Sequence, residues 1–157
     1  MSEQTLEKVR IVVDEGTLKL TSLRQVSGVI YVQLLERPFP REGWHDLCAS
    51  VLSMWLFSMN RYLLGLDETA TLYFMDGDYA LKLIHRSNQQ SIMSFMEPND
   101  VCVMESEIDV PCFAEQMLAA SEKIMDHFPQ YRDIRNIREI AERADALRDT
   151  LRTTNAR

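Results

Sequence analysis

The chain has few glycines, histidines and cysteines among its 157 residues, and these shortages exclude several kinds of functional site. Its five glycines are scattered, so the glycine-rich loop that cradles phosphate groups is absent. The histidines His45, His85 and His127 lack the spacing of a zinc motif, and structural roles are expected for all three. Neither a serine nucleophile elbow nor a local catalytic cysteine signature occurs. We therefore expect a protein without catalytic activity, cofactor or bound metal.

The three cysteines, Cys48, Cys102 and Cys112, lie inside apolar patterns. An odd number without close pairing argues against a disulfide framework. Reduced cysteine behaves as a small apolar residue and is among the residues most often buried. The sequence therefore predicts three buried and chemically inert thiols.

Long apolar runs are also missing. The most apolar stretch is interrupted by His45, Asp46, Asn60 and Arg61, whereas a membrane span needs roughly 20 predominantly apolar residues. The first residues, MSEQTLEKVRIVVDEG, contain no apolar segment followed by a small-residue cleavage site. We therefore expect a cytoplasmic protein that does not enter the membrane.

Basic residues are scarce in most of the chain. The net charge is −7; residues 1–130 contain 19 acidic and 10 basic side chains, whereas residues 131–157 contain 5 and 7. Nucleic-acid binding requires a basic surface, so the body of the protein is not expected to bind nucleic acid. An acidic body can attract a basic partner, although many proteins are this acidic for solubility alone.

The pattern of β-branched and alternating residues predicts up to seven strands, mostly antiparallel. Turn chemistry predicts hairpins at Glu15-Gly16, at Asp76-Gly77 and at Pro98-Asn99, while Pro38 and Pro40 should end the third strand. Asp76-Gly77-Asp78 also begins like a calcium loop but lacks the later ligands, so we interpret it as a turn. The predicted strands are Lys8–Asp14, Thr17–Leu23, Gly28–Glu36, two runs within Thr69–Arg86, Ser91–Glu97 and Val101–Ile108.

Three helices are predicted. The stretch Gly43–Leu66 is apolar on nearly every side, so it should be covered on more than one side, with Trp44 and Trp55 in the core. Asp109 is a suitable N-cap for a second helix that Pro129 ends. Tyr131–Leu151 has an amphipathic pattern and should pack on the body, although a two-helix seam in a homodimer is the other possibility.

These elements predict an α+β fold in one domain spanning residues 1–157. We expect a mostly antiparallel sheet of about six to seven strands, packed by the central apolar helix and followed by two C-terminal helices. Residues 131–157 should form the last helix, with a frayed end.

Acidic residues gather at the predicted turns and strand ends. Glu105 and Glu107 lie two residues apart on one face of a strand, where like charges repel each other. This cost suggests a surface kept negative for a partner; the alternative is a solvated face with Lys82 or Arg86 opposite. The candidate partner-binding residues are Asp76, Asp78, Glu97, Asp100, Glu105, Glu107 and Asp109.

Two passages carry a family resemblance. One is the helix motif formed by Trp44, Asp46, Leu47, Leu52, Trp55 and Leu56, and the other is the hairpin LYFMDGDYALKL. Together they resemble small bacterial immunity proteins of polymorphic toxin and contact-dependent growth inhibition systems, over roughly residues 28–110. In such proteins an aromatic-rich helix packs on an antiparallel sheet.

The resemblance implies a cytoplasmic protein that binds and neutralises one cognate toxin domain without chemistry of its own. It assigns no functional residues, since contact surfaces differ among immunity proteins. The acidic charge suits a toxin with a basic surface, because opposite charges speed association. The alternative function is a self-associating structural or adaptor module built on the C-terminal helix.

Overall fold

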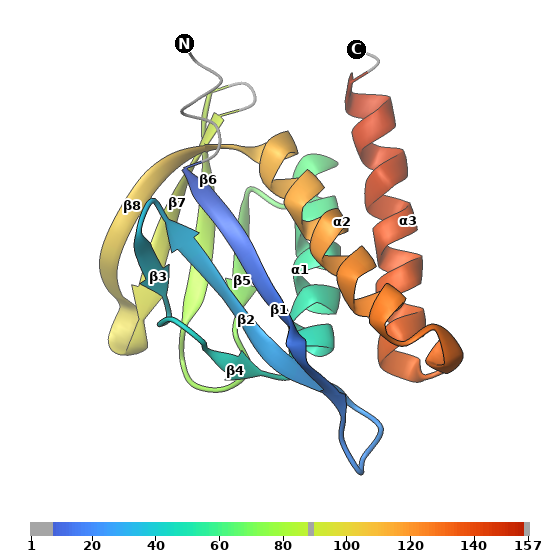
Figure 1. The fold of residues 1–157 in the computed structure, drawn as a ribbon. Helices are drawn as coiled ribbons and strands as arrows, with labels where there is room; N and C mark the ends of the chain where they lie inside the picture. The colour runs from blue at the N-terminus through green and yellow to red at the C-terminus, as the bar shows by residue number, and fades with distance from the viewer. Residues whose placement is uncertain (1–7, 88–89, 156–157) are drawn as a thin grey trace.

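The computed structural model describes residues 8–87 and 90–155, which form eight strands and three helices (Figure 1). This arrangement confirms the predicted α+β class. The strands are β1 (Val9–Leu20), β2 (Val26–Leu34), β3 (Arg37–Phe39), β4 (His45–Asp46), β5 (Thr69–Tyr73), β6 (Ala80–Ser87), β7 (Gln90–Glu97) and β8 (Val101–Asp109). The helices are α1 (Cys48–Leu63), α2 (Val110–His127) and α3 (Arg135–Asn155).

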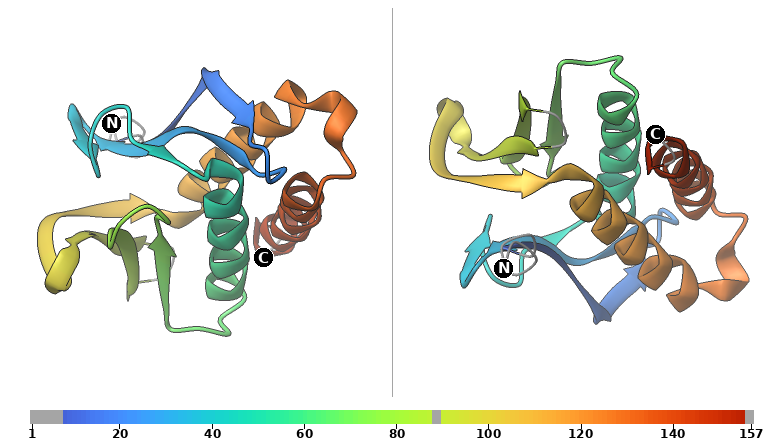
Figure 2. Two further views of the ribbon diagram at one scale, coloured as in Figure 1. Left: turned by 90° about the horizontal axis from the view of Figure 1, so that it is seen from below. Right: turned by 90° about the horizontal axis from the view of Figure 1, so that it is seen from above.

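The strands divide into two antiparallel sheets rather than the single sheet that we expected. Sheet A has the order β1-β2-β3, with β4 also paired to β2, and sheet B has the order β5-β6-β7-β8. The chain leaves sheet A through α1 before sheet B begins, and α1 packs on both β2 and β5. Figure 2 shows the sheets as separate layers beside α1, with α3 on the other side of that helix.

Helix α1 is shorter than the predicted Gly43–Leu66 because its first residues are used for strand pairing. His45 and Asp46 form β4, opposite Val29 and Gly28 of β2. The helix is covered by other elements as predicted, since nine of its sixteen residues are buried. Within the described residues, no helix is long and apolar enough to cross a membrane.

The predicted turn at Glu15-Gly16 is wrong, because β1 runs straight through it. The register of β1 on β2 shifts between Asp14 and Lys19, which marks a bulge. Inside the bulge, the Gly16 amide donates to Asp14 Oδ1 (3.1 Å), and the Thr17 hydroxyl accepts from the Val29 amide (2.8 Å). The polar residues that favour a turn in the sequence therefore accept hydrogen bonds from backbone amides in the bulge instead.

The other turns largely follow the prediction. The Asp76-Gly77 hairpin joins β5 to β6, and Gly77 has a φ of 100°. The Pro98-Asn99 turn joins β7 to β8. Pro38, expected to lie outside any strand, is instead part of the short strand β3 and pairs with Gln33.

The two C-terminal helices pack on the body as predicted. Asp109 caps α2 by accepting a hydrogen bond from the Cys112 amide (2.9 Å), and α2 ends before Pro129. Helix α3 continues to Asn155, and residues 156 and 157 lie outside the described part of the chain. The apolar stripe of α3 is buried: Ile137, Ile140, Ala144, Leu147 and Leu151. This stripe faces α1 and α2 and is not open to a second copy.

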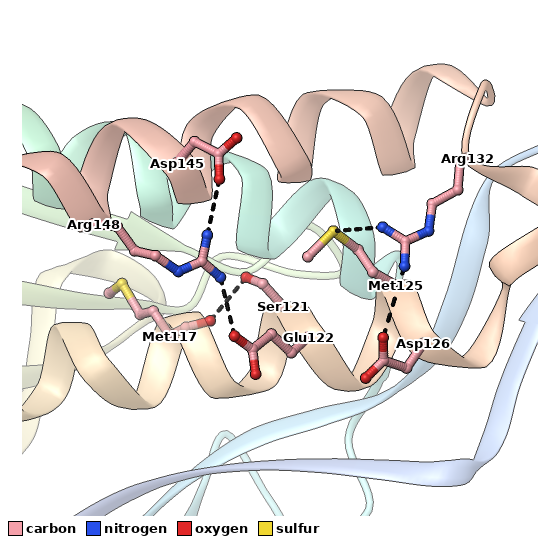
Figure 3. A network of polar contacts seen from close by, with 8 residues as sticks. All are labelled: Met117, Ser121, Glu122, Met125, Asp126, Arg132, Asp145 and Arg148. Atoms are coloured by element: carbon pink, nitrogen blue, oxygen red, sulfur yellow. Dashed lines mark hydrogen bonds and ion pairs between the residues drawn. The ribbon is translucent and has the colours of Figure 1, made fainter.

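Polar contacts also join α2 to α3 (Figure 3). Arg148 of α3 reaches Glu122 of α2 (3.0 Å) and Asp145 on its own helix (2.9 Å). Near the turn between the helices, Arg132 lies 3.7 Å from Asp126. These groups are largely exposed, so the buried apolar stripe rather than the ion pairs holds the helical layer together.

Candidate partner-binding surface

The outer face of sheet B carries most of the predicted acidic residues. Side chains alternate along its strands, so the row Leu72, Leu81 and Phe95 is buried against the core. The neighbouring row on the opposite face is Thr71, Lys82, Ser94 and Glu105, paired across all four strands. This outer face reaches solvent: Tyr73 is 53% exposed and Ile84 is 44% exposed.

The β5–β6 and β7–β8 turns lie at the same end of sheet B, since Ala80 at the start of β6 pairs with Met96 near the end of β7. There the outer face forms a hollow of about 290 Å³. It is lined by Thr71, Tyr73, Asp78, Ala80, Lys82, Met96, Glu97 and Asp100. The fold thus brings together three of the predicted acidic residues from two separate hairpins.

The charges around this hollow are not neutralised in pairs. Within residues 8–87 and 90–155, no ion pair involves Asp78, Glu97, Asp100 or Lys82. Three carboxylates and one ammonium group line the hollow, so its formal charge is negative. The turn places Asp100 at its rim with a φ of 58°, in the left-handed region that Asn and Asp adopt more readily than most residues.

Glu105 and Glu107 share the outer face of β8, as the sequence predicts, but each has a local partner. The Ser94 hydroxyl donates to Glu105 Oε2 (3.0 Å). Arg86 Nη1 lies 2.6 Å from Glu107 Oε1, in an exposed ion pair. Arg86 therefore offsets part of the acidic charge, as the solvated-face alternative anticipates.

Asp76 and Asp109 lie apart from the hollow. The Asp109 carboxylate caps α2, so it has a structural task. Asp76 helps to line a second hollow of about 410 Å³, which lies at the start of α1. That hollow is lined by Ser27, His45, Asp46, Leu47, Met75 and Asp76. The seven predicted residues therefore do not form one continuous site.

The residue that positions the β5–β6 turn is Asp46, whose role the sequence did not reveal. Its side chain is buried and accepts four hydrogen bonds. The donors are Trp44 Nε1 (3.0 Å) and the backbone amides of Leu47 (2.8 Å), Met75 (3.0 Å) and Asp76 (3.2 Å). The W-x-D motif thus has a physical meaning, because it ties the start of α1 to the hairpin of sheet B.

An aromatic cluster supports this connection from inside. Phe74, which follows β5, lies edge-on to Trp55 (5.3 Å between ring centroids), Phe39 (6.1 Å) and Trp44 (6.4 Å). Trp55 is fully buried and Trp44 half-buried. Both tryptophans therefore contribute to the core as expected, and the acidic hairpin rests on a well-packed base.

The cysteines differ in their surroundings, and the prediction of three buried thiols is wrong. Cys48 is buried, and burial raises the pKa of its thiol to about 12. Cys112 is half-buried, and Cys102 is exposed on the outer face of β8. Cys102 lies next to the β7–β8 turn, where the register of β8 on β7 shifts, so that Cys102 pairs with Met96 and breaks the alternation seen at Glu105 and Glu107.

The histidines are not gathered around a common point. His85 stacks on the Tyr62 ring with 4.3 Å between centroids, and Tyr62 shares a 2.7 Å hydrogen bond with the buried Ser91 hydroxyl. Burial raises the pKa of the Tyr62 phenol. Among the described residues, no group of three or more His, Cys, Asp and Glu side chains has the geometry of a metal site.

Comparison of the chain with protein-family models, with curated proteins and with solved structures found no match. The geometry and charge of the protein's own surfaces are therefore what indicate its function.

Proposed function

We propose that this protein is an immunity-type inhibitor, which binds and neutralises a cognate bacterial toxin domain in the cytoplasm and has no catalytic activity of its own. The observation that carries the proposal is the hollow on sheet B, which is lined by Asp78, Glu97 and Asp100. None of the three has an ion-pair partner among the described residues. A surface of this kind suits a partner with basic side chains, such as a toxin whose substrate groove is basic.

The arrangement of the hollow supports a protein partner. Its lining combines the apolar atoms of Tyr73, Ala80 and Met96 with charged side chains. Protein interfaces commonly combine a less charged centre with a polar rim, and exposed tyrosine is enriched among residues that dominate binding energy. Lys82 also lines the hollow and disfavours a second cation beside it. The three carboxylates are therefore the expected contacts for the partner's lysines and arginines.

Acidic charge at this surface also speeds association. Complementary charges can raise association rates well above the values of neutral pairs, and this gain falls as salt screens the charges. Rapid capture suits an inhibitor that must neutralise a toxin before it acts. Neutralisation itself needs no chemistry, because a bound protein can cover the groove of the toxin.

The test is co-expression with the product of the neighbouring gene, followed by binding measurements on the purified pair. We expect the full chain to restore growth to cells that express the toxin, and the two proteins to form a complex. The triple variant Asp78→Lys, Glu97→Lys and Asp100→Lys should bind at least about tenfold more weakly, with a smaller dependence on salt.

A matched control separates the local surface from net charge. Glu36, Glu42 and Glu142 are exposed and lie away from the hollow, and changing these three to lysine alters the net charge by the same amount. This control variant should retain most of the affinity. Equal losses in both variants would overturn the assigned surface, and a neighbouring gene without toxic activity would overturn the immunity function.

A further inference from the structure

The strands at the sheet edges differ in how their outward backbone groups are satisfied. In β1, the Ile11 amide donates to Gln116 Oε1 (2.8 Å), and Gln116 Nε2 donates to the Val9 carbonyl (2.7 Å). One side-chain amide of α2 therefore makes the two hydrogen bonds that a neighbouring strand would make. This pairing occupies the Val9 and Ile11 backbone groups on the edge of sheet A that faces α2.

The first edge of sheet B is also covered. Helix α1 packs along β5, and Trp55 Nε1 donates to the Tyr73 carbonyl (2.8 Å). Trp55 is fully buried, so this part of the edge is shielded from solvent as well as hydrogen-bonded. An added strand could not reach β5 there without displacing the helix.

The second edge of sheet B is β8, which has no strand beside it except β7 in the part of the chain that the structure describes. Figure 1 shows β8 at the left margin of the fold, beyond β7. Within the described residues, no backbone hydrogen bond joins β8 to a segment other than β7. Additional contacts are local: Cys102 Sγ donates to the Met104 carbonyl (3.4 Å), and the Ser106 hydroxyl donates to the Glu107 carbonyl (3.0 Å). The pairing of β8 with β7 shifts register between Phe95 and Met96, and beyond this shift residues 104–109 pair regularly. This regular part of β8 presents backbone groups in the geometry that another strand requires.

The side chains along β8 indicate what such a strand would contain. Glu105 and Glu107 project from the outer face, whereas Met104 and Ser106 project from the inner face and are half-buried. A complementary strand would place basic side chains beside the glutamates and apolar side chains beside Met104. Its sequence would therefore alternate basic and apolar residues.

The same charges disfavour pairing between two copies of this chain. Antiparallel pairing of β8 with itself would bring Glu105 and Glu107 close to the glutamates of the other copy. Acidic residues on an edge strand are a common protection against self-association. The edge is therefore selective for a basic strand, and a second copy is not its expected occupant.

We propose that β8 is a strand-addition site for an extended segment that alternates basic and apolar residues. The inference rests on the proposed function for the basic character of the partner, and it specifies how that partner is held. Backbone hydrogen bonds to the edge would provide affinity, and the alternating side chains would provide selectivity.

The test uses the full chain and a short acetylated peptide that alternates lysine and valine, with amide hydrogen exchange measured by NMR. In the free protein, we expect the outward amides of β8 to exchange faster than the Ile11 amide of β1. Addition of the peptide should slow exchange along β8 and leave β1 unchanged. Slow β8 exchange in the free protein, or no protection by the peptide, would overturn the proposal.

Two control peptides separate strand addition from simple charge attraction. One is N-methylated at every valine and the other at every lysine, so each loses the backbone donors of one edge while it keeps its charges. Because one peptide edge must pair with β8, at least one of these peptides should bind about tenfold or more weakly than the parent. Equal binding of all three would show that charge alone attracts the peptide, and the proposal would fail.

The variant Glu105→Lys with Glu107→Lys tests the selectivity. We expect it to lose peptide protection of β8 while its Tm stays nearly unchanged. If the peptide protects β8 but the neighbouring gene product does not bind, strand addition stands and the immunity function fails. If that product binds and protects the hollow instead of β8, the immunity function stands and strand addition fails.

Discussion

Sheets A and B have the same size and the same antiparallel pairing, but they are used differently. Sheet A is joined to the helical layer, since Gln116 of α2 closes the edge of β1 and Asn136 of α3 accepts from the Val26 amide (3.2 Å). Sheet B is held through β5 and α1, while its outer face and the edge of β8 remain open. Sheets A and B therefore differ in their contacts with the helices rather than in the composition of their strands.

Acidic residues also differ in their surroundings between the junction of the two sheets and the outer face of sheet B. The buried carboxylate of Asp46 has four donors and connects the two sheets. Asp78 and Asp100 are exposed and Glu97 is half-buried, and all three line a hollow on the outer face of sheet B. A satisfied buried charge rigidifies its surroundings, whereas an exposed unpaired charge contributes little to stability and stays available for a partner.

The largest expected effect is at the junction that supports sheet B. Trp55→Ala removes a fully buried indole that contacts Phe74 and hydrogen-bonds β5, so it should lower the free energy of unfolding by about 3–5 kcal/mol. Urea denaturation measures this change. Phe57→Ala on the same helix is the control, because Phe57 is half exposed, and it should cost less than about 1 kcal/mol. Equal costs would mean that α1 does not support sheet B through Trp55.

A second large effect should follow from the link between the sheets. Asp46→Ala leaves Trp44 Nε1 and the Met75 and Asp76 amides without their acceptor, which should cost about 2–3 kcal/mol. Thermal unfolding gives the cost, and amide exchange should become faster at residues 75 and 76. Asp76→Ala removes an exposed neighbouring carboxylate and should have little effect. A stable Asp46→Ala protein with unchanged exchange would contradict the assigned role.

A smaller effect is expected at the closed edge of sheet A. Gln116→Ala removes two hydrogen bonds from β1 and should cost about 1–2 kcal/mol. The exchange rate of the Ile11 amide should rise towards the rates of the outward amides of β8. Glu115→Ala, at an exposed neighbouring position, is the control. An unchanged Ile11 rate would mean that the two edges do not differ in the way we describe.

The smallest effect concerns the ion pair between Arg61 in the last turn of α1 and Asp67, which follows the helix. The hydrogen bond and charge of Arg61, 2.9 Å away, lower the pKa of Asp67. The pair therefore stabilises the fold at pH values above the unfolded pKa of Asp67 and loses this contribution as the pH falls through the folded pKa. Asp67→Asn should give a slightly lower Tm than the parent at neutral pH, and the difference should vanish well below about pH 4. A difference that persists unchanged in acid would exclude this ion pair as its cause.

Local chemistry was enough to predict many elements. Asp109 was expected to cap α2 and does so, and the Asp76-Gly77 turn forms where the dipeptide indicates. The prediction of a turn at Glu15-Gly16 was wrong because turn-forming residues are also found in bulges. Only the pairing of β1 with β2 selects the bulge. The predicted length of α1 was too great for a similar reason. His45 and Asp46 form β4 through pairing with β2, which the local sequence does not indicate.

The acidic site was predictable in part. Asp78, Glu97 and Asp100 meet because the meander places alternate turns at one end of a sheet, a consequence of antiparallel order that the sequence indicates. The neutralisation of Glu107 by Arg86 and the use of Asp109 as a cap depend on geometry across strands and helices. Glu105 and Glu107 were placed on one face correctly, because alternation is a local property of a strand.

By itself, the sequence determined the α+β class, most strand and helix positions and the acidic turns of sheet B. These features depend on periodicity, turn residues and caps, which act over a few residues. The tertiary structure decided that the strands form two sheets, that Asp46 joins them, and that β1 is closed while β8 is open. Those outcomes depend on contacts between distant segments, such as Gln116 with Ile11, and no local pattern specifies which distant segment will supply a partner.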